Sequence, residues 1–181
     1  MKPNTNLILS AFFVISLSSC LENRDKRPLR IQKDIIEQAA EDSLCPKVTP
    51  NLLRAVFQVE SKVKMNSVAF EGHYLKRKSG TWEQMLHEFE NATSHCKGQI
   101  MGKEARKYGV EPKELRADEE TCVRLTALML GKDICEREKG NIRYGVMAYN
   151  AGASWRKKDL GTIAAAAIHA DKVMNVLKRM S

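Results

Sequence analysis

Apolar residues recur at every third or fourth position along most of this chain, the spacing of one face of an α-helix. Start and stop residues support this periodicity: Thr49 with Pro50, Thr81 and Asp118 resemble helix starts, and Gly152 resembles a helix end. Residues 62–80 instead show some alternation and fit short extended or irregular pieces. The pattern predicts helices over 31–45, 47–61, 81–92, 102–109, 118–138, 140–152 and 159–180.

One charged residue falls on an apolar stripe of the second predicted helix. Leu53, Val56 and Phe57 mark the core-facing side, and Glu60 follows at the next helical step on that side. A glutamate near a helix end usually points to solvent, because Glu is rarely buried. The alternative is an acid held in a cleft, where burial favours its protonated form, as a general acid requires.

The N-terminal residues are predicted not to belong to the fold. An apolar run from Leu7 to Leu17 is too short to span a membrane and ends in "LSSC", which is typical of a secretory signal. The tetrapeptide resembles a bacterial lipobox, whose cysteine, here Cys20, becomes lipid-modified and N-terminal. Leu21 after this cysteine favours the periplasmic face of the outer membrane; an ordinary secretory signal is the alternative.

These features divide the 181-residue chain into three parts. We expect a signal peptide over 1–19, a lipidated cysteine with a charged tether over 20–34, and a single domain over 35–181. Lys2 is the only charged residue of 1–19, so the mature chain keeps all but one of the eight net positive charges. An exported basic protein suits an anionic partner of the cell envelope, and we expect no nucleic-acid partner outside the cytoplasm.

The remaining four cysteines, an even number in an oxidising compartment, predict two disulfides. Cys122 and Cys135 share one predicted helix, where 13 residues span about 20 Å, too far for a direct bridge. Two pairings stay open: Cys45–Cys135 with Cys96–Cys122, or Cys45–Cys122 with Cys96–Cys135. No Cys-x-x-Cys or close His spacing suggests a metal, and we expect no metal and no cofactor.

Three separated stretches carry candidate chemistry: "VESK" at 59–62, "GQIM" at 98–101 and "AYNAG" at 148–152. Their order resembles the goose-type-lysozyme and soluble-lytic-transglycosylase superfamily, whose members cut the glycan strands of peptidoglycan. The resemblance covers roughly residues 35–175 and implies a mostly α, lysozyme-like fold with at most a small β or irregular insertion. Glu60 and Gln99 are 39 positions apart, which exceeds the usual transglycosylase spacing. "AFEGHYLKR" at 69–77 looks more like phage N-acetylmuramidases.

The resemblance assigns roles to individual residues. Glu60 would be the catalytic acid, Tyr149 would hydrogen-bond that acid or the neighbouring sugar, and Glu71 would be a second carboxylate. The expected substrate contacts are Gln99, Asn150, Ser61, Met101, His73 and Trp155. Four of these residues also have a purely structural explanation. Glu60 could be solvated, Tyr149 could be a packing residue, Glu71 could order its loop, and Gln99 could stabilise a turn.

Two chemistries follow for the same substrate. A lytic transglycosylase uses one glutamate and the substrate's own N-acetyl group, and gives a 1,6-anhydro product without water. A hydrolytic N-acetylmuramidase would add Glu71 as base or nucleophile. We favour the transglycosylase because of "AYNAG". The alternative from another functional class is a lipoprotein that binds the cell wall without cleaving it. An envelope-spanning machine is a possible partner that the sequence does not identify.

Overall fold

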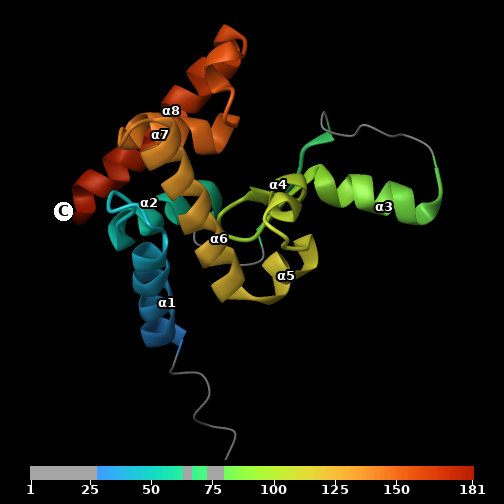
Figure 1. Ribbon diagram of the computed structural model, residues 1–181, viewed down its shortest axis with the longest axis horizontal. Coiled ribbons are helices and arrows are strands. Elements are labelled where there is room, and N and C mark those ends of the chain that lie inside the picture. Colours follow the sequence, from blue (N-terminus) through green and yellow to red (C-terminus); the bar gives the residue numbers. More distant parts are fainter. Residues whose placement is uncertain (1–27, 63–66, 73–79) are drawn as a thin grey trace, which may run out of the picture.

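The computed structural model describes residues 28–62, 67–72 and 80–181, with side chains from residue 35 onward. Helices make up most of it, together with one small sheet (Figure 1). The prediction of a mostly α fold is confirmed at this level. Cys20 and His73 lie outside the described residues. None of the described helices is long and apolar enough to span a membrane.

The helices follow the predicted order. Their bounds are α1 Pro28–Asp42, α2 Pro50–Ser61, α3 Trp82–Asn91, α4 Gly102–Lys107, α5 Pro112–Ala117, α6 Glu119–Gly131, the π-helix η3 Lys132–Arg137, α7 Ile142–Ala151, the 3₁₀ turn η4 Trp155–Lys157 and α8 Leu160–Met180. Two bounds differ from expectation. α1 starts inside the segment expected to be a tether, and α5, which starts at Pro112, lies between the helices predicted over 102–109 and 118–138.

Side chains at the predicted helix starts satisfy the free backbone N–H groups there. Thr49 accepts a hydrogen bond from the Leu52 N–H, and Thr81 forms a reciprocal capping box with Gln84. Asp118 accepts two such bonds at the start of α6. Gly152 follows α7 with a φ of +87°, a conformation that favours glycine. The local signals read from the sequence therefore act as predicted.

The sheet supplies the small β insertion. β1 (Val68–Phe70) pairs antiparallel with β2 (Thr93–His95), which pairs antiparallel with β3 (Ile100–Met101). Val68 lies opposite His95, and Ser94 lies opposite Met101. α3 is joined to this sheet and α4 and extends away from the other helices (Figure 1). It has no buried residue, and Trp82 is 70% exposed.

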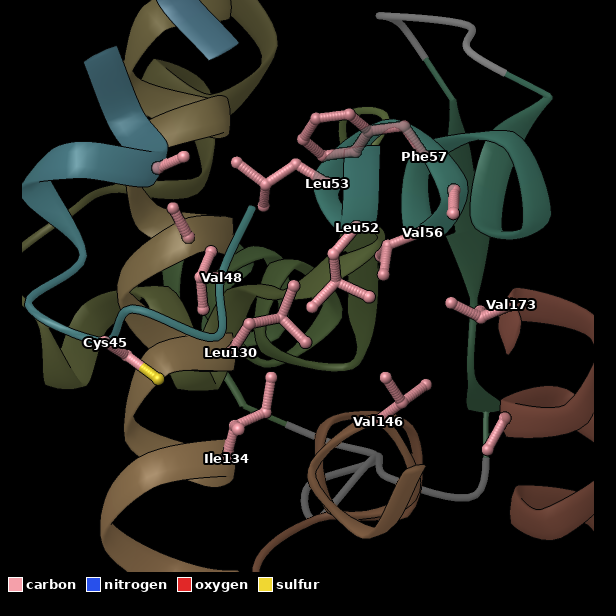
Figure 2. Packing of buried hydrophobic residues seen from close by; sticks show 14 of the residues in the cluster. Cys45, Val48, Leu52, Leu53, Val56, Phe57, Leu130, Ile134, Val146 and Val173 are labelled. Atoms are coloured by element: carbon pink, nitrogen blue, oxygen red, sulfur yellow. The ribbon is translucent and has the colours of Figure 1, made fainter. Parts of the chain in front are cut away.

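Helix α2 lies at the centre of the main hydrophobic core. Its Leu53, Val56 and Phe57 are at most 1% exposed, as the apolar stripe predicts. Figure 2 shows this side of α2 facing side chains from η3, α7 and α8. A second cluster lies between β2, β3, α4, α5 and α6 and contains Cys96, Ile100, Ala105, Leu115, Cys122 and Leu125.

Two disulfides join distant parts of the chain. Cys45 is bonded to Cys135, and Cys96 is bonded to Cys122, with Cα–Cα distances of 5.9 and 6.3 Å. This is the first of the two pairings that the sequence left open. Cys122 and Cys135 lie on one continuous helical run formed by α6 and η3, which is why they do not pair with each other.

Candidate functional site

Glu60 lies in the last turn of α2, directly after the buried stripe. Its side chain is only 11% exposed. The helix ends at the next residue, Ser61, and the following Lys62 adopts a left-handed conformation with φ of +53° and donates its N–H to the Phe57 carbonyl. Ser61 Oγ donates to the same carbonyl at 3.2 Å. Ser61 therefore closes the helix, and Glu60 is held in a sheltered position.

A histidine from the last helix faces this carboxylate. Nε2 of His169, on α8, lies 3.1 Å from Oε1 of Glu60, and the His169 side chain is 15% exposed. Nε2 is buried and has no aligned hydrogen-bond partner among the described residues, so the 3.1 Å contact lacks hydrogen-bond geometry. The sequence analysis missed His169. Its one signal was its position beside Ala166 and Ala170 on the buried side of an apolar helix.

Tyr149, on α7, is the third member of the group. Its hydroxyl donates a 2.7 Å hydrogen bond to the Gly98 carbonyl. Burial, followed by the negative charge of Glu60, raises the pKa of the phenol well above its usual range. The hydroxyl is therefore neutral and a permanent donor. Tyr149 therefore lies close enough to Glu60 for the charge of that carboxylate to act on its phenol.

The turn between β2 and β3 lies against this group. At Gly98, a Cβ would come within 2.2 Å of Thr126 Oγ1 and 3.3 Å of the Tyr149 hydroxyl, so only glycine fits. The preceding Lys97 is fully buried, lies 4.9 Å above the Phe57 ring and forms a 2.5 Å ion pair with Glu119. The turn is thereby fixed to both α2 and α6.

Gln99 uses its side chain inside this turn. Its Nε2 donates to the carbonyls of Cys96 at 2.9 Å and Ser67 at 3.2 Å, and its Oε1 accepts from Ser94 Oγ at 2.9 Å. The residue itself has a left-handed backbone with φ of +51°. These bonds stabilise a backbone conformation that few side chains adopt. They give Gln99 the turn-stabilising role that was the alternative to substrate binding.

The other predicted contacts divide between surface and interior. Asn150 is exposed, and Met101 is partly buried at the start of α4. Trp155 is only 6% exposed and donates its Nε1–H to Glu138 at 3.0 Å. The Arg156 guanidinium covers its ring at 4.4 Å. Trp155 is thus a packing residue in this structure and offers little surface for stacking on a sugar.

Glu71 directly follows β1. Its backbone N–H donates to the Ala92 carbonyl at 2.8 Å, which continues the pairing of β1 beyond Phe70. His73, one of the expected substrate contacts, lies outside the described residues. The structure fixes the backbone position of Glu71 beside the sheet, and its catalytic role stays a prediction.

A second sheltered carboxylate, Asp133, escaped the sequence analysis. It lies in η3, and burial raises its pKa to about 6, although the nearby Arg137 acts in the opposite direction. α7 packs tightly on this segment, since a Cβ on Gly145 would lie 2.2 Å from Ile134 Cγ1. Single π-helical turns in α-helices are frequent at functional sites. Its signal was an acid three residues after buried Leu130, the same pattern as Glu60.

Glu60 can release and take up one proton. His169 and Tyr149 can hold its carboxyl in place. No three His, Cys, Asp or Glu side chains among the described residues are grouped to hold a metal ion. Comparison with family models, curated proteins and solved structures gave no match. The candidate site therefore rests on these residues and their geometry.

Proposed function

We propose that this protein cleaves the β-1,4 linkage between N-acetylmuramic acid and N-acetylglucosamine in peptidoglycan, as a lytic transglycosylase with Glu60 as its acid and base. The observation that carries the proposal is the sheltered Glu60 carboxyl, 11% exposed and 3.1 Å from His169. The order of the motifs "VESK", "GQIM" and "AYNAG" indicates the substrate class, the glycan strands of peptidoglycan. A largely buried acid at a helix end has little structural benefit of its own.

The proposed reaction uses one carboxyl twice. Protonated Glu60 gives its proton to the glycosidic oxygen as the bond from C1 to that oxygen breaks. The substrate's N-acetyl group stabilises the positive charge that develops at C1. The C6 hydroxyl of the same sugar then attacks C1, and the Glu60 carboxylate accepts the proton of that hydroxyl. A 1,6-anhydro ring forms, no water is consumed, and Glu60 ends protonated.

His169 and Tyr149 act as positioning residues in this scheme. His169 restricts the rotation of the Glu60 carboxyl through the 3.1 Å contact. Tyr149 ties α7 to the Gly98 turn next to that carboxyl. Precise placement matters because general acid–base catalysis requires hydrogen-bond reach between the acid and the leaving oxygen.

The direct test is Glu60→Gln, which keeps the shape of the side chain and removes its proton transfer. We expect the release of soluble fragments from sacculi to fall by about 10²–10⁴-fold, with the melting temperature retained. Glu88→Gln, which changes a partly exposed glutamate of α3, is the matched control and should keep full activity. A variant that unfolds would instead assign Glu60 to a structural ion pair with His169, and unchanged fragment release would contradict the proposal.

A further inference from the structure

A cleft runs along the seam between α2 and α8, beside the candidate site. It has a volume of about 710 Å³ and is lined by Gln58 and Val59 from α2 and by Lys172, Asn175, Val176, Lys178 and Arg179 from α8. Positions 172, 175, 176 and 179 recur at helical spacing and share one face of α8. The lining therefore combines three cations and two amides with a short apolar floor.

The charge of this cleft is unbalanced. None of its seven lining residues is acidic. Its three cations form no ion pair with any described residue, whereas most described arginines do. Asp171 on the same helix accepts bonds of 2.7 and 3.1 Å from Arg143, and the charge of Lys178 acts on this carboxylate without an ion-pair contact. Like charges on one helix face repel each other, so the cleft favours an anion with several charges.

The cleft reaches Val59, the residue directly before Glu60. α2 and α8 run antiparallel, because Glu60 meets His169 near one end of the seam and Asn51 Nδ2 donates to the Met180 carbonyl at the other, at 3.2 Å. With a rise of 1.5 Å per residue, Lys172 lies about 5 Å and Arg179 about 15 Å from His169 along the helix axis. An anion in the cleft would thus lie beside a glycan held at Glu60.

We infer that this cleft binds the carboxylates of the peptides attached to a peptidoglycan strand. This rests on the proposed function. An extended peptide advances about 3.3–3.6 Å per residue, so three or four residues would cover the distance from Lys172 to Arg179. Lys and Arg bind carboxylates through charge-assisted hydrogen bonds. The two amide side chains, Gln58 and Asn175, are suited to the peptide backbone.

Binding of a soluble disaccharide–tetrapeptide to the full-length protein tests this inference by calorimetry. The second ligand is the same compound with its carboxylates converted to carboxamides. We expect the carboxamide form to bind about tenfold more weakly, since each exposed ion pair contributes only modestly. K172Q/K178Q/R179Q should show the same loss with the unmodified ligand. K113Q/K157Q/K158Q removes three exposed lysines outside the cleft and should bind as the wild type does.

Other outcomes would overturn the inference. Equal binding of the carboxylate and carboxamide forms, or equal losses in both triple variants, would show that the cleft does not select carboxylates. Inorganic phosphate and vesicles containing phosphatidylglycerol serve as the phosphate probes. If K172Q/K178Q/R179Q loses only the binding of these phosphate probes, the site binds phosphate headgroups instead. Cleavage of sacculi without charge-dependent ligand binding would refute this inference alone, and binding without cleavage would refute the proposed activity alone.

Discussion

At the scale of single residues, Glu60 and Asp133 share one property: each is an acid at a position where the helix pattern calls for an apolar side chain. Both are sheltered in the fold, with side-chain exposures of 11% and 4%. The rule that singled out Glu60 would also have found Asp133 if it had been applied to the helix after Leu130. Periodicity alone could not show that His169 faces Glu60, because that contact joins residues 109 positions apart.

Removing the Tyr149 hydroxyl should loosen the site. Tyr149→Phe deletes the donor of the 2.7 Å hydrogen bond to Gly98 and leaves that carbonyl without this partner. We expect a loss of about 1–3 kcal/mol in the free energy of unfolding, measured by urea denaturation. Tyr144→Phe is the control, because its ring is 39% exposed, and it should change stability by less than about 0.5 kcal/mol. Equal effects would contradict the role assigned to Tyr149.

Asp133 should make stability depend on pH. Its pKa rises from 3.8 to about 6 on folding, so between these values the folded state binds more protons than the unfolded state. Stability should therefore fall as pH rises through this window. A shift of about two units corresponds to about 3 kcal/mol, a penalty that persists at neutral pH.

Asp133→Asn tests this dependence. The variant should flatten the fall in the free energy of unfolding between pH 4 and pH 7, measured by urea titration at each pH. Asp171→Asn is the control, since hydrogen bonds from Arg143 lower the pKa of that exposed carboxyl, and it should not flatten the fall. An unchanged slope in Asp133→Asn would assign the pH dependence to other groups.

At the scale of elements, the sequence predicted what depends on local chemistry. The starts of α2, α3 and α6 and the end of α7 coincide with side chains that cap a helix or glycines that end one. The π-helical turn of η3 was not predictable from the apolar pattern, and its close packing against Gly145 of α7 joins residues of two different elements. The role of Gln99 was likewise hidden, because its partner Ser67 lies 32 residues away.

The two disulfides should contribute unequally to stability. Cys45–Cys135 joins residues 90 positions apart, and Cys96–Cys122 joins residues 26 apart. In the loop-entropy description, removing the longer link costs about 4.6 kcal/mol and removing the shorter about 3.5 kcal/mol. C45A/C135A should therefore unfold at lower urea concentration than C96A/C122A. The reverse order would show that local packing around Cys96, rather than chain entropy, dominates.

At the scale of the whole molecule, helix α2 connects the fold to the proposed chemistry. Its apolar face forms the centre of the core (Figure 2), its last turn presents Glu60, and its outer face forms one wall of the cationic cleft. The lipid on Cys20 and the location at the outer membrane stay predictions from the sequence. Both would place a basic, wall-directed domain next to peptidoglycan.

The central claim is tested most directly by mass spectrometry of the soluble products that the purified protein releases from peptidoglycan sacculi. The account predicts fragments ending in 1,6-anhydro-N-acetylmuramic acid, which the Glu60→Gln variant fails to produce. Fragments with reducing N-acetylmuramic acid ends would mean hydrolysis and would make Glu71 the leading second carboxylate. Release of no fragment, under conditions where a muramidase digests the same sacculi, would contradict the claim and favour a wall-binding protein.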